Sequence, residues 1–207
     1  MLASAVQIAG KYWPMFWAGI KITLLVSLTG TIIGLVIGLI VGSARSISSK
    51  IEPRDSFATK IVKRIVNVIA CVYIEFFRGT PMMVQAVFLY YGLKSVFNWT
   101  PVVAGICIIS INTGAYMAEI LRSGIQSVDV GQTEAARSIG MTSAQTMLHV
   151  VLPQGIKNAF PAIGNEFVVN IKDSSVLNAI SVTELFSSQT RSRAASLISP
   201  PHFWLRL

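Results

Sequence analysis

Carboxylate and amide side chains recur at helical spacing inside a mainly apolar segment, residues 154–182. Glu166, Asn170 and Asp173 are separated by four and then three residues, which places them on one face of a helix. Carboxylates on such a face can bind the ammonium group or cationic side chain of a small solute, or couple to ions. Because ionisable groups are costly at membrane depth, we expect this face to line a watery path or to pack polar side inward.

A second polar face has the same spacing within the apolar segment 102–121. It consists of Asn112, Tyr116 and Glu119. We predict that the two faces together contribute to a substrate path. Hydrogen bonding between packed helices is an equally open interpretation of both. We expect no catalytic residue, metal site or cofactor.

The composition indicates that the apolar segments lie in lipid. Of the 207 residues, 53% are hydrophobic and only 13% are charged, with a mean hydropathy of +0.62. Soluble domains have about 25% charged residues. The isoelectric point near 9.8 fits either nucleic-acid binding or the basic cytoplasmic loops of a membrane protein, so it does not decide between them.

Four membrane spans are predicted, at about 15–42, 82–97, 102–121 and 154–182. The first span is followed by six basic residues between 43 and 64, which marks that loop as cytoplasmic. Residues 65–77 are too few and too polar for a crossing of their own, so 61–97 is expected to cross once. Two further crossings, within 61–97 and at 102–121, return the chain to the cytoplasmic side. Residues 129–153 are therefore expected in the cytoplasm. Gly30, Gly34, Gly38 and Gly42 form a small face on the first span, suited to close helix packing.

The stretch EAARSIGMTSAQTMLHVVLP, residues 134–153, is too polar for a span and contains helix-terminating signals of its own. Gly140 suits the left-handed residue that ends a helix. Thr142 and Gln145 form a capping box that begins a second helix, and Pro153 is expected to end it. Such a pair of short helices suits docking into a groove on another protein. DNA binding and an inert loop are the alternatives, but a third helix is missing and the unit is tethered between spans.

These residues resemble a known family. The pattern E-A-A, three residues, G, nine residues, V-x-L-P resembles the EAA loop of ABC-importer permeases. The matching positions are Glu134, Ala135, Ala136, Gly140, Leu152 and Pro153. FFRGTPMMVQAVFLYYGL, TGAYMAEILRSGIQSV and GNEFVVNIKDSSVL are similar to the polar amino-acid uptake permeases, the transmembrane subunits of histidine, glutamine and arginine importers. The resemblance covers residues 17–185.

The resemblance implies an all-α polytopic protein of the inner membrane, with the helical bundle of a type I ABC importer permease. Residues 1–185 would form the permease domain, with a cytoplasmic coupling loop at 129–153. The implied partners are a second permease subunit, identical or different, a pair of ATP-binding subunits, an extracytoplasmic solute-binding protein and an amino-acid substrate, with no nucleic acid. The sequence contains no G-x-x-x-x-G-K-[ST] loop, so the chain is expected to be a transport subunit and not an enzyme.

The motif Arg78, Gly79, Thr80 and Pro81 is interpreted as structural, with Arg78 an interface anchor or pin in preference to a ligand for a substrate carboxylate.

Residues 186–207 depart from the family pattern, which has another hydrophobic span there. Arg191, Arg193, two consecutive prolines and the lack of a long apolar run suggest a truncated or frame-shifted terminus, or a natural short variant. Two alternative functions therefore stay open at this point: a non-functional truncated permease and an ion-coupled secondary carrier. The EAA loop argues against a carrier, because a carrier needs no ATPase-docking element.

Overall fold

The computed structural model describes residues 2–49, 56–182, 187, 188 and 190, and within this part of the chain the elements are helical. Predictions for residues 50–55, and for the tail apart from 187, 188 and 190, lie outside the described residues. In chain order the elements are α1 (Leu2–Ser48), α2 (Phe57–Gly79), α3 (Met82–Phe97), α4 (Pro101–Gln126), α5 (Val130–Ser138), α6 (Ser143–Thr146), a π-helical turn (Met147–Val151), α7 (Leu152–Asp173) and a 3₁₀-helix (Ser174–Ile180).

The centre of the fold is the crossing of α1 and α4, where the glycine face of α1 allows the two backbones to approach closely. A Cβ atom added at Gly34 would lie 2.7 Å from the Thr113 side chain, and one at Gly38 would lie 2.4 Å from the Met117 Cβ. The predicted small packing face is therefore confirmed. Beside it, a core of buried side chains joins α1, α3, α4 and the 3₁₀-helix. Its members are Val26, Ala86, Tyr90, Ala104, Ile108, Ile109, Leu177, Ile180 and Val182.

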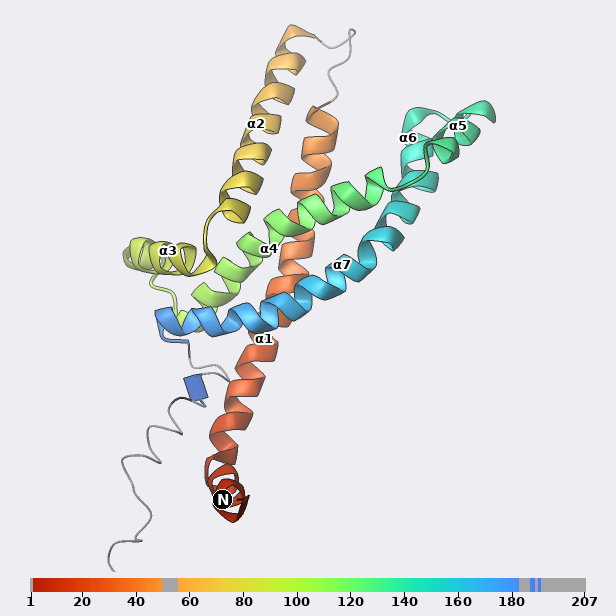
Figure 1. The fold of residues 1–207 in the computed structure, drawn as a ribbon. Coiled ribbons are helices and arrows are strands. Elements are labelled where there is room, and N and C mark those ends of the chain that lie inside the picture. Colours follow the sequence, from red (N-terminus) through yellow and green to blue (C-terminus); the bar gives the residue numbers. More distant parts are fainter. Residues whose placement is uncertain (1, 50–55, 183–186, 189, 191–207) are drawn as a thin grey trace, which may run out of the picture.

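Residues 57–97 form two separate helices, α2 and α3, which run in different directions (Figure 1). α2 has 23 residues because its first turns include the basic residues that we assigned to the loop. It ends because Pro81 holds the preceding Thr80 in an extended conformation, with φ −111° and ψ 145°. α3 then runs crosswise to α2 (Figure 1). The helix before the RGTP break is thus longer than the 13 residues considered from the sequence, while the single crossing expected for 61–97 stays a prediction.

The expectation that Pro153 ends the second short helix of residues 134–153 was wrong. The chain is helical without interruption from Ser143 to Asp173. The turn before Pro153 widens to π-helical geometry, in which the Leu152 N–H donates to the carbonyl of Met147, five residues back. Because proline lacks an N–H and its ring collides with the preceding turn, a widened turn allows the helix to continue through it.

The helix expected to run to residue 182 tightens into the 3₁₀-helix at Ser174, after α7 ends at Asp173. α4 and α7 run side by side (Figure 1), and α5 and α6 lie at the same end of the molecule as the ends of α1 and α2 nearest residues 50–55. Two helical stretches in the described residues are long and apolar enough to cross a membrane, Tyr12–Ser48 and Pro101–Gln126, while Met82–Phe97 is apolar but shorter. The all-α fold class is confirmed.

Candidate translocation cavity and coupling unit

A cavity of about 630 Å³ lies between the α2–α3 turn, α4 and α7. It brings together four of the six predicted path residues, which are Asn112, Tyr116, Glu166 and Asp173, and all four residues of the RGTP motif. Met82, Met83, Val169 and Val176 complete its lining. Since 630 Å³ falls within the usual range of small-molecule sites, roughly 300–1,000 Å³, the cavity can accept a solute of amino-acid size.

Two carboxylates face this cavity without a hydrogen-bond or ion-pair partner among the residues that the structure describes. Glu166 is only 7% exposed, yet neither it nor Asp173 forms a hydrogen bond or ion pair with any residue that the structure describes. Buried charged groups in folded proteins are normally paired. An unpaired buried carboxylate beside a cavity is therefore a strong candidate for binding a cationic group from outside the chain.

Arg78 contributes the positive charge of the cavity. Its guanidinium carbon lies 5.5 Å from the ring centroid of Tyr116, a cation–π contact. It forms no hydrogen bond or ion pair within the described ranges, and its side chain is exposed at the cavity. The interpretation of Arg78 as an anchor or pin stays a prediction, and a guanidinium on this wall also suits an anionic ligand group.

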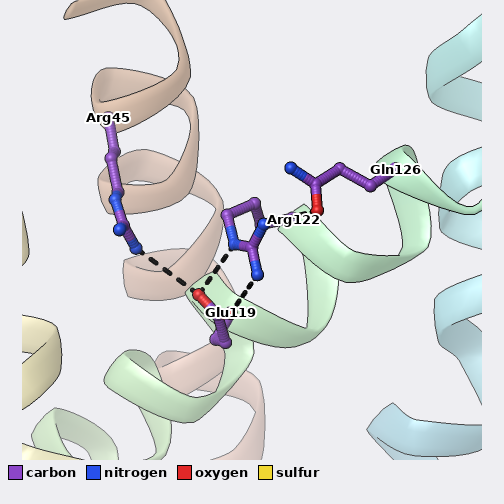
Figure 2. Close-up of polar contacts among 4 residues, drawn as sticks. All are labelled: Arg45, Glu119, Arg122 and Gln126. Carbon is purple, nitrogen blue, oxygen red and sulfur yellow. Dashed lines mark hydrogen bonds and ion pairs between the residues drawn. The ribbon is translucent and has the colours of Figure 1, made fainter. Parts of the chain in front are cut away.

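Glu119 does not line the cavity. It accepts hydrogen bonds from Arg122 of the same helix, 2.9 Å from Nε, and forms an ion pair of 3.4 Å with Arg45 of α1 (Figure 2). Arg122 in turn donates to Gln126 in the last turn of α4, at 2.5 Å. The cluster joins α1 to α4. The assignment of Glu119 to the substrate path is therefore replaced by a structural role.

Asn170 also serves helix packing. It is 2% exposed, and its side-chain amide donates to the Thr31 hydroxyl at 2.8 Å and accepts from the Thr113 hydroxyl at 3.0 Å. The Ser27 hydroxyl donates to its backbone carbonyl at 3.0 Å. These bonds join α1, α4 and α7, so the alternative interpretation, hydrogen bonding between helices, describes Asn170.

The coupling unit, residues 129–153, has the predicted caps and glycine turn, although Pro153 does not end its second helix. The Asp129 side chain caps α5 by accepting from the Gly131 N–H at 2.6 Å. Gly140 has φ +88°, with its N–H donating to Arg137 and the Met141 N–H donating to Ala136. This is the Schellman arrangement that ends a helix. The predicted capping box between Thr142 and Gln145 then begins α6.

The exposed surface of the coupling unit carries three large apolar side chains among polar ones. Val130, Ile139 and Leu148 are exposed, with Ile139 at 81%, and Glu134 is exposed between them on α5. Ala136 is buried at the contact of α5 with the rest of the unit. A shallow depression is lined by Ile139, Gly140, Met141, Gln145 and His149. Exposed apolar side chains around a depression are typical of a protein-docking surface.

A second glycine contact, which the sequence analysis missed, attaches this unit to the helices. A Cβ atom at Gly124 of α4 would lie 2.5 Å from the Gly155 carbonyl oxygen, and one at Gly155 of α7 would lie 2.9 Å from the Ile125 Cα. The Asn158 amide donates to the Ser127 hydroxyl at 2.9 Å. The base of the coupling unit is thus fixed to both helices that lead away from it.

The structure is a bundle of apolar helices with a cavity among them and an exposed pair of short helices at one end (Figure 1). Residues 56–203 match the family described as "Binding-protein-dependent transport system inner membrane component", and the chain belongs to this family. It is 41% identical over 127 residues to the probable amino-acid permease protein YxeN of Bacillus subtilis, covering 59% of this chain and 57% of that protein. It is 40% identical over 124 residues to the glutamine transport system permease protein GlnP of Escherichia coli, covering 58% and 57%. The chain thus spans little more than half the length of these curated relatives.

The fold is also similar to that of solved transporters. A chain from the crystal structure of an amino acid ABC transporter with histidines aligns with a TM-score of 0.75 and 35% identity, covering 91% of this chain and 88% of that one. A chain of the MetNI methionine ABC transporter in an inward-facing conformation aligns with a TM-score of 0.68 at 20% identity, which supports the fold alone.

Proposed function

We propose that the chain is the permease subunit of an ATP-driven ABC importer for polar amino acids, that it forms the translocation path, and that it couples to a separate ATPase. The observation that carries this proposal is the position of Glu166. This buried and unpartnered carboxylate faces the cavity from the same uninterrupted helix that begins in the coupling unit.

The cavity matches the charges of an amino acid. Arg78 is suited to the α-carboxylate, because a guanidinium binds carboxylates in a bidentate manner. Glu166 and Asp173 are suited to the ammonium group or to a cationic side chain. The positive charge comes from the last turn of α2 and the negative charges come from α7, so a change in the relative position of these helices alters both contacts together.

The helical stretch from Ser143 to Glu166 provides the mechanical link. Its 23-residue separation corresponds to about 35 Å at ~1.5 Å per residue. A displacement of α5 and α6 by a docked ATPase would therefore reach the cavity through one continuous helical stretch. The exposed Val130, Ile139 and Leu148 are the residues that would contact the groove of the ATP-binding subunit.

A second permease subunit would cover the open face of α7. Phe160, Asn165 and Lys172 are exposed on this helix. An exposed amide and an exposed cation on this helix are poorly suited to lipid, whereas they suit a wet interface between two subunits. An extracytoplasmic solute-binding protein would deliver the amino acid at the opposite end from the coupling unit.

The test of the cavity is the Glu166→Gln variant, which keeps the size of the side chain and removes its charge. We expect the KM for amino-acid uptake to rise about tenfold or more, because a charged hydrogen bond contributes about 1.5–3 kcal/mol. Uptake is measured in membrane vesicles that contain the ATP-binding and solute-binding partners. Glu75→Gln, which removes the charge of an exposed carboxylate on α2 that does not line the cavity, is the matched control. A KM unchanged in Glu166→Gln would contradict the role of the cavity.

The proposed topology places the coupling unit in the cytoplasm and the α3–α4 turn outside. The ends of α1 and α2 nearest residues 50–55 lie at the same end as α5 and α6, which supports this assignment (Figure 1). Single cysteines replacing Ser49, Asn98 and Ser143, all exposed, are introduced in a background without Cys71 and Cys107. In intact cells an impermeant maleimide should label position 98 alone. Labelling of 143 without 98 would invert the topology.

A further inference from the structure

The break between α2 and α3 leaves backbone carbonyls without helical partners. Pro81 has no N–H to donate, and Thr80 is extended. The N–H and hydroxyl of Thr80 both donate to the Phe76 carbonyl, at 3.2 and 2.8 Å. The carbonyls of Phe77 and Thr80 therefore require donors from elsewhere in the fold.

Two buried side-chain amides supply these donors. Gln85 of α3, 4% exposed, places Nε2 3.0 Å from both the Phe77 and the Thr80 carbonyl oxygens and 2.6 Å from the Thr80 hydroxyl. Asn112 of α4, 6% exposed, donates from Nδ2 to the Phe77 carbonyl at 3.2 Å and to Gln85 Oε1 at 3.0 Å. Three helices thus meet at one pair of amides, which we name the amide clamp (Gln85 and Asn112).

The amide clamp holds the backbone on both sides of Arg78. Phe77 precedes this residue and Thr80 follows it by two positions, while Arg78 itself has no hydrogen bond or ion pair in the described part of the chain. Its guanidinium contacts the ring of Tyr116, which lies one helical turn after Asn112 on α4. The position of the guanidinium on the cavity wall is therefore set by backbone that the clamp fixes.

We propose that Gln85 and Asn112 are positioning residues that hold Arg78 against the cavity, and that they thereby set the selectivity of the permease for a substrate carboxylate. The positioning role rests on the hydrogen bonds above. The consequence for selectivity rests on the proposed function. Asn112 thus acts through Arg78, since both of its amide hydrogens are used within the clamp.

The positioning role is tested without a substrate. Cysteines replace Arg78 and Tyr116 in a chain lacking Cys71 and Cys107, and a short bis-methanethiosulfonate reagent cross-links them in membranes containing the partner subunits. Gln85→Met keeps the side-chain volume and removes the donors. It should lower the cross-linking rate at least about fivefold, as expected from the loss of about one hydrogen bond. Ser110→Ala is the matched control, because Ser110 is equally buried but bonds only within α4, to Ile106. An unchanged rate in Gln85→Met would overturn the proposal.

The selectivity is tested by uptake of labelled L-arginine, L-histidine and L-glutamine, each in competition with its α-carboxamide analogue. Arg78→Ala and Gln85→Met should both reduce the preference for the free carboxylate at least about fivefold. The exchange Gln85→Asn with Asn112→Gln, which keeps an amide on each helix, should recover part of that preference. If Arg78→Ala changes the preference and Gln85→Met lowers uptake of acid and amide equally, the clamp is a folding element only. If Arg78→Ala, Gln85→Met and the exchange variant all fail to accumulate in the membrane, the clamp is likewise a folding element only.

A failure of the proposed function gives a different result. If the unmodified chain with its partners transports none of the three amino acids, the substrate assignment fails, while the cross-linking rate still decides whether the clamp positions residue 78.

Discussion

Gly38→Leu is expected to prevent accumulation of the folded chain in the membrane. Even a single Cβ at this position would lie 2.4 Å from the Met117 Cβ and 2.9 Å from the Ala118 backbone nitrogen, and the backbone atom cannot move aside as a side chain does. Forcing extra carbons into a packed contact costs about 1–3 kcal/mol, and a leucine between two backbones costs more. Because α1 and α4 form the central crossing of the fold, their separation removes the support of the remaining helices.

Membrane-fraction abundance and resistance to proteolysis measure this effect. Gly92→Leu is the matched control, since Gly92 lies in the apolar helix α3 and a Cβ there meets no atom within 4 Å. We expect at least a tenfold difference in abundance between the two variants, corresponding to about 1.4 kcal/mol. Similar abundance and protease resistance of both variants would mean that the α1–α4 crossing is not as close as described.

Gly140→Val is expected to uncouple amino-acid uptake from ATP hydrolysis, while the variant chain still inserts in the membrane. At φ +88° any side chain is strained, and a β-branched one most of all, at a cost of about 1–3 kcal/mol. No atom lies within 4 Å of an added Cβ, so the effect comes from the backbone turn between α5 and α6 and not from a collision. The altered turn would displace the exposed apolar residues that we propose contact the ATPase.

The measurement is ATP-driven uptake together with co-purification of the ATP-binding subunit. We expect both to fall about tenfold or more in Gly140→Val, with abundance little changed, since the strain is local to an exposed loop. Gly140→Asn, which tolerates the left-handed conformation, should retain most of both activities. Normal transport by Gly140→Val would remove the coupling unit from the mechanism.

Features governed by nearest neighbours in the chain could be predicted from the sequence. The left-handed Gly140 and the Thr142–Gln145 capping box depend on fewer than seven consecutive residues, and both have the expected geometry. The shared face of Glu166 and Asp173 follows from helical spacing, and both residues line the cavity. Residues at this spacing lie on the same face of a helix however that helix packs against the rest of the protein.

Features that depend on distant partners could not be predicted. Glu119 pairs with Arg45, 74 residues away, and this pairing, not the i, i+7 spacing to Asn112, decides its role. Asn170 and Glu166 have the same periodicity, yet one bonds to Thr31 and Thr113 while the other is unpaired. A polar residue on a helix face shows that a partner is needed, but only the packing shows which partner it has.

The junctions between elements were the least predictable part. Pro153 lies in a helix because a π-helical turn accommodates its ring, and sequence rules treat such a proline as a helix end. Gln85 was overlooked as one amide in an apolar helix. Its position after the RGTP break was the available signal, because the end of α2 leaves carbonyls that need a donor.

The most direct test of the central claim is uptake by proteoliposomes that contain this chain, its ATP-binding subunits and a second permease subunit, with the solute-binding protein and labelled amino acid outside. We predict accumulation that requires ATP and the solute-binding protein, and that falls when either is omitted or when the chain carries Gly140→Val. Accumulation driven by an ion gradient in the absence of ATP and of the ATP-binding subunits would contradict the assignment and identify a secondary carrier.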